Sequence, residues 1–338
     1  GSLLTSGISS LCEIPAYTYS GKGITMTTLV FGGTGFIGRR TIPRLVKNGE
    51  KVVVMDINPG TANFRDFSDD VRVIAGDITN FEDVIKAIMD AKPDRIMNLA
   101  YLLGSGEDTP HFALRINIMG MDNCFEAARL CGVNRITYAS SIAVSGLQTN
   151  FGDHMTNEDD FMYGTRQYSK HKMFNEYQAS QYNRIYGMNI TGIRPPNVTG
   201  YDKVRGSTDH VLAIVLPAEG LPVNFPYKAI TRLPLHVDEI AEIFTRVTLA
   251  NSSVYEVYNA GGTPISLGEI ADIVKELIPD AQITFDSEGG IEQSDNYLVD
   301  NSRLLSEFEL EYAPYRDRVL QMINEVREHH GMPLVQVN

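Results

Sequence analysis

The chain has 338 residues, enough for one large α/β domain or for a nucleotide-binding domain with a smaller appendage. Its net charge of −13 argues against nucleic acids and anionic membranes as partners, because both are bound by basic surfaces. Its three cysteines (Cys12, Cys124 and Cys131) contain no CxxC pair, and no segment reaches the roughly 18 apolar residues of a membrane span, so we expect a cytoplasmic protein with reduced thiols and no bound metal.

Residues 1–25 differ in character from the rest of the chain and begin with Gly-Ser, which resembles a cloning scar. They lack the basic start and the long apolar core of a secretory signal. Met26 directly precedes the first strong strand pattern. We therefore expect 1–25 to be a disordered leader or tag and Met26 to be the native start.

From residue 26 to 195, short apolar runs of strand length alternate with segments of helical periodicity. The predicted strands are 27–32, 51–56, 71–77, 94–100, 134–141 and 188–195, and the predicted helices are 36–49, 81–91, about 110–131 and 163–187. Strands that are apolar almost throughout are typical of a parallel sheet covered on both faces. The pattern predicts a Rossmann-type, doubly wound parallel sheet over 26–195 that binds a dinucleotide.

After residue 195 the alternation becomes irregular. Helical patterns remain at 238–250, 266–278 and about 315–329. We interpret 196–338 as a smaller C-terminal region that mainly binds substrate and is interleaved with the first domain.

A glycine-rich loop joins the first strand to the first helix, in the stretch VFGGTGFIGRR. Gly32 permits a tight turn, Gly35 lets a phosphate approach the backbone, and Gly38 lets the helix pack on the strand. A dinucleotide pyrophosphate binds a helix N-terminus only where no side chain intervenes. We expect this loop, with Phe36 and Ile37, to hold the cofactor; a structural turn is the alternative.

Asp56 ends the second strand, 18 residues beyond Gly38. A carboxylate at this place can accept hydrogen bonds from the adenosine ribose, and it repels a 2′-phosphate. Asp56 therefore predicts NAD rather than NADP, unless it serves only as a turn residue.

Tyr168 and Lys172 are four residues apart in a predicted helix and so share one face. A nearby ammonium is expected to lower the pKa of the tyrosine toward working pH, so that its phenol can exchange a proton with a substrate hydroxyl. Ser140 and Ser141 end the fifth strand, where the sheet meets its ligand crevice. A serine there can orient the reacting oxygen, although a loop start is the simpler explanation.

The ordered motifs GGTGFIG, GDIT, NLA, NIMG, YASSIAVSG, YSKHK, RPPNVTG and RLPLHVDEIA resemble the extended short-chain dehydrogenase/reductases, the NAD-dependent epimerase/dehydratase group, over residues 26–330. The resemblance implies that Ser141, Tyr168 and Lys172 are catalytic and that Tyr168 and Lys172 also contact NAD. It further implies roles for other residues: Asp77 and Ile78 beside adenine, Leu99 and Ala100 beside nicotinamide, Asn117 in support, and Asn197 and Arg232 with Ser141 at the substrate. Similar proteins pair two long helices into a homodimer, which we expect here.

Two reactions fit this set of residues. Ile142 and Ala143 stand where sugar dehydratases resemble one another in carrying an acidic pair, so dehydration is disfavoured. The first reading is an NAD-dependent dehydrogenase of a secondary alcohol, because RGSTDH and RLP are similar to segments of the L-threonine dehydrogenase branch. The second is a nucleotide-sugar 4-epimerase with retained NAD, because Arg232 and His236 fit the Arg-x-x-x-His pattern of that group. A protein that binds NAD without turnover is disfavoured by the intact Tyr–Lys–Ser set. Lys203 and Arg205 are expected to be solvated.

Overall fold

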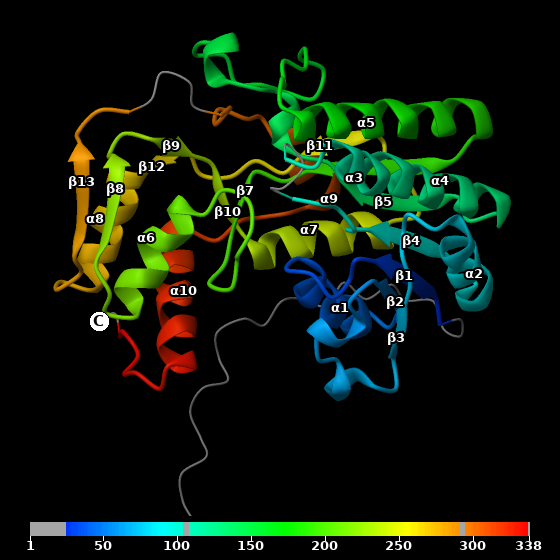
Figure 1. The fold of residues 1–338 in the computed structure, drawn as a ribbon, viewed down its shortest axis with the longest axis horizontal. Coiled ribbons are helices and arrows are strands. Elements are labelled where there is room, and N and C mark those ends of the chain that lie inside the picture. Colours follow the sequence, from blue (N-terminus) through cyan, green and yellow to red (C-terminus); the bar gives the residue numbers. More distant parts are fainter. Residues whose placement is uncertain (1–24, 104–107, 291–294, 337–338) are drawn as a thin grey trace, which may run out of the picture.

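The computed structural model describes residues 25–103, 108–290 and 295–336. Within these ranges, parallel strands form one sheet in the order β3-β2-β1-β4-β5-β6-β11 (Figure 1). The strands are β1 (Thr27–Phe31), β2 (Lys51–Asp56), β3 (Val71–Ala75), β4 (Arg95–Asn98), β5 (Arg135–Ala139), β6 (Asn189–Arg194) and β11 (Val257–Asn259). The predicted Rossmann-type sheet is confirmed. The expected leader lies outside the described residues, apart from Thr25.

Helices cover both faces of this sheet (Figure 1). One face carries α1 (Gly38–Lys47) and α7 (Val237–Leu249); the other carries α2 (Phe81–Ala91), α4 (Met121–Leu130) and α5 (Gln167–Tyr186). Strand β1 shows why its sequence is apolar throughout: Leu29 and Phe31 lie in the core under α2 and α4, while Val30 lies in the core under α1 and α7.

The chain reverses its direction of growth between β1 and β4. Strands β1, β2 and β3 extend the sheet one way, and β4, β5 and β6 extend it the other way from β1. Ligands of open parallel sheets bind beyond the carboxyl ends of the strands at such a reversal. Several of the predicted site residues come directly after the carboxyl ends of these strands and so lie at this edge of the sheet.

Several predicted boundaries differ from the structure. The long helix expected at 110–131 consists of α3 (Pro110–Leu114), a π-helical turn (Arg115–Gly120) and α4. Helix α5 begins at Gln167 rather than at 163, because an extended segment precedes it. Strand β11 was not predicted as part of the sheet, since three residues are too few for a periodic signal.

The C-terminal region has its own core, built between α6 (Asp209–Ala218), α8 (Leu267–Leu277) and α10 (Tyr315–His329). Its strands form short pairs: β8 (Val223–Tyr227) with β13 (Ile283–Ser287), and β9 (Thr231–Arg232) with β12 (Ile265–Ser266). A third pair, β7 (Asn197–Thr199) with β10 (Pro234–His236), leads into α7, and α9 (Ser302–Phe308) packs near β11. The division at residue 195 stays a prediction, and β11 and α7 from beyond it complete the sheet and its cover.

Four short 3₁₀ turns complete the described elements, at Pro59–Thr61, Arg65–Phe67, Ile142–Val144 and Gln148–Asn150. None of the helices in the described ranges is both long and apolar enough to cross a membrane. Cys124 and Cys131 are free thiols.

Candidate active site

The glycine loop brings bare backbone to the carboxyl end of β1. Gly32 has a φ of +72°, and a Cβ added to it would lie 2.6 Å from the Ala100 nitrogen of the neighbouring β4 loop. A Cβ on Gly38 would lie 2.3 Å from the Gly33 oxygen. Side chains are therefore excluded at Gly32 and Gly38 by contact with other backbone, as the close-packing role of these glycines requires.

The start of α1 beside this loop is free for an anion. Helix α1 has no side-chain cap at Ile37 and no acidic residue in its first turn. A Cβ on Gly35 would meet only the Gly32 oxygen, at 3.2 Å, within 4 Å. The helix N-terminus therefore presents the positive end of its dipole next to open backbone, which fits a dinucleotide pyrophosphate.

Asp56 ties the loop to the end of β2. Its Oδ2 accepts the backbone N–H of Thr34 at 3.2 Å, and its Oδ1 accepts that of Asn58 at 3.0 Å. Each carboxylate oxygen has a second lone pair left for a ribose hydroxyl. Asp56 thus stands where the sequence placed it, and its ribose contact stays a prediction.

The expected adenine and nicotinamide neighbours follow β3 and β4 at the same edge. Asp77 Oδ1 accepts the Thr79 N–H at 2.8 Å, which fixes the turn, and Ile78 is largely buried against the helix at Gly120. Strand β4 ends at Asn98, two residues before the predicted end at residue 100, so Leu99 and Ala100 begin the loop that follows it. All four lie at the edge expected of them, and their contacts with NAD stay predictions.

Asn117 supports that loop from within the protein. Its side chain is buried in the π-helical turn, where Oδ1 accepts the Leu102 N–H at 2.8 Å and Nδ2 donates to the Leu102 carbonyl at 3.2 Å. Its own carbonyl accepts from Asn175 of α5 at 3.0 Å. Asn117 therefore positions the β4 loop relative to α5, and the π-turn aims it there; such turns are frequent at functional sites.

The three expected catalytic side chains come together at the end of β5 and the start of α5. Ser141 follows β5, Tyr168 lies in the first turn of α5, and Lys172 lies one turn later. The Ser141 hydroxyl lies close enough to the phenol of Tyr168 to oppose the rise in the pKa of that phenol. Lys172 is buried, and its Nζ donates to the Ala139 carbonyl at 2.5 Å. In this arrangement Tyr168 can serve as a general acid/base, with Ser141 and Lys172 as its polar neighbours.

One electrostatic expectation was wrong. Burial raises the pKa of Tyr168, and the opposing effects come from the Ser141 hydrogen bond and the Arg166 charge rather than from Lys172. Burial also holds the pKa of Lys172 well below its ordinary value, against the nearby Glu176. The loss of hydration outweighs the proximity of the two side chains on one helix face, so the resting tyrosine is a neutral phenol.

Tyr101, in the loop after β4, lies against both Lys172 and Tyr168. Lys172 Nζ is 3.2 Å from the centroid of the Tyr101 ring and 5.7 Å from that of Tyr168. The Tyr101 and Tyr168 rings meet edge to face at 5.5 Å. Tyr101 therefore lines the site and receives the Lys172 ammonium on its face.

A buried ion pair behind the site was missed by sequence reasoning. Arg194 at the end of β6 binds Glu176 through two nitrogens, at 2.8 and 2.7 Å, and Ser140 donates to the same carboxylate. Glu176 lies one turn after Lys172 on α5, and that spacing was the available signal. Ser140 thus anchors α5 to β5 and leaves Ser141 for chemistry.

The expected substrate residues Asn197 and Arg232 lie on β7 and β9, in the C-terminal region. Asn197 Oδ1 accepts the Leu233 N–H at 2.9 Å, and Leu233 packs with Ile142, the residue after Ser141. Arg232 on β9 is bound to the Asp209 carboxylate. The contact between Leu233 and Ile142 brings this segment next to the catalytic turn.

Two histidines near the expected substrate residues, His210 and His236, are buried. His236 caps α7, where its Nδ1 accepts the Asp238 N–H at 3.3 Å, and burial lowers the pKa of His236 to about 4. Its ring, Asp238 and Glu325 offer potential metal ligands within 4.8 Å of one another, but Arg44 already binds Asp238 there. His210 is likewise fully buried, beside Asp209.

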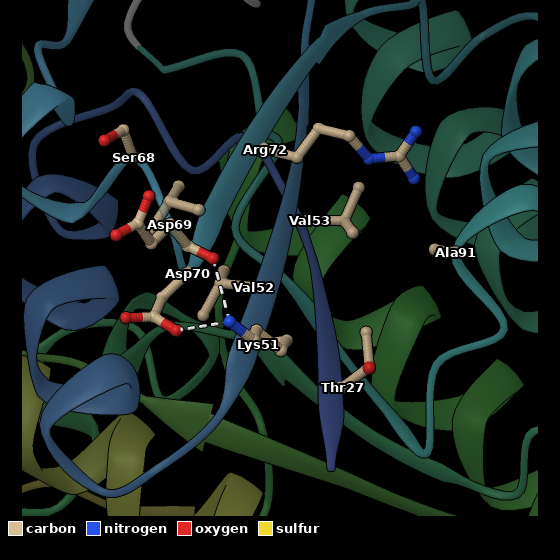
Figure 2. A pocket seen from close by; sticks show the side chains of 10 residues that line it. Thr27, Lys51, Val52, Val53, Ser68, Asp69, Asp70, Arg72 and Ala91 are labelled. Atoms are coloured by element: carbon tan, nitrogen blue, oxygen red, sulfur yellow. Dashed lines mark hydrogen bonds and ion pairs between the residues drawn. The ribbon is translucent and has the colours of Figure 1, made fainter. Parts of the chain in front are cut away.

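A surface hollow elsewhere carries no such constellation. Figure 2 shows it at the amino ends of the first strands, lined by Thr27, Lys51 and Arg72 among others. Lys51 Nζ donates to Asp70 at 2.6 Å and to the Asp69 carbonyl at 2.8 Å. These are the opposite ends of the strands from the glycine loop, where ligands of parallel sheets do not bind.

Comparison with known proteins decides the family. The model of the NAD-dependent epimerase/dehydratase family matches residues 28–261. The chain belongs to this family. It is an enzyme of the extended short-chain dehydrogenase type, and NAD is its cofactor.

Relatives within the family differ in their reactions. A UDP-glucose 4-epimerase of Mycolicibacterium smegmatis is 29% identical over 231 residues, covering 65% of this chain and 72% of that protein. A Thermus thermophilus UDP-glucose 4-epimerase, solved with NAD, has a TM-score of 0.78 at 22% identity and covers 89% of this chain and 99% of its own. An L-threonine dehydrogenase of Clostridium difficile has a TM-score of 0.76 at 20% identity, with 90% and 98% covered. At such identities the solved structures establish the fold.

Proposed function

We propose that the protein transfers a hydride from a secondary alcohol of a small polar or sugar-like substrate to NAD, with Tyr168 as general acid/base. The observation that carries this proposal is the grouping of Tyr168 and Lys172 one helical turn apart, with Lys172 Nζ 5.7 Å from the Tyr168 ring, beside Ser141 at the end of β5. The glycine loop and the free start of α1 lie at the same edge of the sheet and would hold the pyrophosphate.

Ser141, Tyr168 and Lys172 have different roles in this reaction. Bound NAD supplies the hydride acceptor. Ser141 orients the substrate hydroxyl, and Tyr168 takes its proton, which requires the phenolate form. Since burial raises the pKa of Tyr168, oxidation of the alcohol is expected to accelerate as pH rises above neutral. Lys172, held between Ala139 and Tyr101, places its amino group beside the developing phenolate, whose negative charge favours the protonated amine.

The favoured reaction is that of a dehydrogenase, which releases ketone and NADH. Ile142 and Ala143 form a short 3₁₀ turn after Ser141, and Ile142 packs against Leu233 and Val299, so the turn supplies no carboxylate for elimination. Similarity of fold to an L-threonine dehydrogenase is compatible with a small substrate. The second candidate is a nucleotide-sugar 4-epimerase, because UDP-glucose 4-epimerases are among the sequence relatives.

One experiment separates the two reactions. The purified protein is denatured and its released dinucleotide quantified by mass spectrometry, and fresh protein is then assayed with L-threonine plus NAD and with UDP-glucose. A dehydrogenase is expected to contain little NAD after purification and to form NADH with its substrate. A stoichiometric NAD content together with conversion of UDP-glucose to its 4-epimer would establish the second candidate. No reaction with any secondary alcohol in a broader panel would contradict both.

We also propose a homodimer through α4 and α5, which run side by side (Figure 1). Helix α5 exposes Phe174, Tyr177 and Ile185 on one side. Leu130 at the end of α4 and Met119 in the π-helical turn before α4 are also exposed. Exposed apolar side chains that gather on neighbouring helices mark an interaction surface. Light scattering is expected to give twice the mass of one chain, and the double variant Phe174→Glu/Tyr177→Glu is expected to give one. A monomeric wild-type protein at micromolar concentration would contradict this assembly.

A further inference from the structure

Arg232 is already bound by a carboxylate of its own chain. Its Nε lies 3.1 Å from both oxygens of Asp209, and its Nη2 also donates to Oδ2. The two side chains are only 14% and 23% exposed. A guanidinium engaged in this way has used much of the fork with which it would grip an anion, and its charge is matched.

Asp209 is held in place from its other side as well. Its Oδ1 accepts the backbone N–H of His210 at 2.8 Å and lies 3.2 Å from the ring Nδ1 of His210 and 3.4 Å from the Ser207 hydroxyl. Burial alone would raise the pKa of this carboxyl, but the hydrogen bonds from His210 and Arg232 outweigh it and hold the pKa well below its usual range. Asp209 is therefore ionised at neutral pH.

Lys203 adds one further charge to this cluster. It is half-buried, and burial lowers its pKa to about 8, with the Asp209 charge opposing that shift and the Arg232 charge assisting it. Lys203 is therefore less exposed than the solvated lysine that the sequence predicted. Lys203, Arg232 and Asp209 together carry a net charge of about +1 at neutral pH.

The cluster borders the catalytic turn. Leu233, next to Arg232, shares a small apolar cluster with Ile142 and Val299, and the Leu233 N–H donates to Asn197 Oδ1. Ile142 in turn follows Ser141 at the end of β5. The charge of this cluster therefore acts on whatever the substrate presents on that side.

We propose that Asp209 is a specificity-determining residue that neutralises Arg232, so that the substrate side accepts a ligand with at most one negative charge and rejects a nucleoside diphosphate. This inference rests on the proposed function, since it concerns the substrate side of that site. The diphosphate of a nucleotide sugar carries two negative charges, and free UDP carries close to three at neutral pH. To bind it with the whole guanidinium, Arg232 would have to leave Asp209, and a largely buried carboxylate without its cation would then face the phosphates.

The test is a calorimetric titration of UDP into protein saturated with NAD, so that UDP cannot occupy the nucleotide site of the cofactor. Wild type, Asp209→Asn and Glu276→Gln are compared. Glu276→Gln is the matched control: it removes the same charge from an Asp/Glu–Arg pair, with Arg316, on the surface of the same region. We expect no saturation of wild type or control below about 1 mM and at least tenfold tighter binding by Asp209→Asn.

Wild-type binding of UDP in the micromolar range, or an Asp209→Asn variant that binds UDP no better than wild type, would overturn the proposal. The thermal transition and the NAD affinity of Asp209→Asn show whether it is folded; Asp209→Ser, which keeps a hydroxyl at the first turn of α6, replaces it if it is not. The titration needs no turnover. A gain of UDP binding without any alcohol-dependent NADH formation would therefore leave this inference standing and remove the proposed function.

Discussion

The parallel-sheet half and the C-terminal region of this chain are organised by different kinds of contact. In the first, each strand pairs with a neighbour and each helix covers a face, so that β1 to β6 repeat one unit. In the second, strand pairs of two to five residues join segments far apart in sequence, such as β9 with β12 and β8 with β13. A repeated unit fixes where a cofactor binds, whereas the irregular region is free to set which substrate binds.

The largest effect should come from chemistry at the junction of the two regions. Tyr168→Phe removes the proton acceptor and is expected to lower kcat by about 10³-fold while NAD affinity stays within about twofold, because the ring and its contact with Tyr101 remain. Steady-state kinetics and an NAD titration measure the two quantities. Tyr186→Phe, at the exposed end of α5, is the control and should behave as wild type. Retained turnover in Tyr168→Phe would end the assignment.

The cofactor half should be far less tolerant of added side chains at the glycine loop than elsewhere. Gly38→Ala places a Cβ 2.3 Å from the Gly33 oxygen and is expected to weaken NAD binding by at least about tenfold and to lower the thermal transition. Gly60→Ala is the matched control, because its Cβ would meet nothing within 4 Å. Equal NAD affinity in both variants would show that the loop does not hold the cofactor.

The C-terminal region should make stability depend on pH. Burial lowers the pKa of His236 to about 4 from 6.5, with the Asp238 charge opposing and the Arg318, Arg40 and Arg44 charges assisting. Between pH 6.5 and pH 4, His236 is therefore protonated in the unfolded chain but neutral in the folded chain. As pH falls through this range, the free energy of unfolding decreases by up to about 3 kcal/mol because of this group. The contribution is complete above pH 6.5 and is lost as pH falls toward 4.

His236→Asn should reduce this dependence, since Asn does not titrate and its oxygen can still cap α7. Burial also lowers the pKa of His210 to about 4, so part of the dependence remains in this variant. Urea unfolding at pH 7 and pH 5 gives the two free energies, with the exposed His154→Asn as control. A slope in His236→Asn as steep as in wild type would contradict the buried, neutral state of His236.

The smallest of these effects concerns the choice of cofactor. Asp56→Ala is expected to reduce the preference for NAD over NADP by about tenfold, with the substrate KM unchanged. Because Asp56 also accepts the Thr34 and Asn58 N–H groups, part of the loss reflects a looser loop, so affinities for both dinucleotides are measured. Asp70→Ala, which breaks the Lys51 pair at the other end of β2, controls for charge. An unchanged preference would remove the ribose contact.

The sequence predicted the sheet, the glycine loop and the grouping of Ser141, Tyr168 and Lys172, because each is a local pattern at the end of a strand or on one helix face. It could not predict that Lys172 would lie against Tyr101, since that depends on how the β4 loop is held by Asn117. The pKa of Tyr168 was misjudged for a related reason: spacing reveals a neighbouring charge but not the burial that outweighs it.

The contacts of the expected substrate residues were less predictable from the sequence. Arg232 was found by its motif, but its pairing with Asp209, 23 residues away, joins β9 to the start of α6 and follows no periodic pattern in the sequence. Glu176 and Arg194 were missed in the same way, as partners from a helix and a strand. Ion pairs between residues that are distant in the sequence could therefore not be predicted from it.

A crystal structure of the protein with NAD tests the central claim most directly. The account predicts the pyrophosphate over Gly32, Gly35 and Gly38 at the start of α1, and the nicotinamide ring within hydrogen-bonding or van der Waals reach of the Tyr168 phenol and the Lys172 ammonium. A dinucleotide bound at another edge of the sheet, or a Tyr168 oxygen directed away from the ring, would contradict it.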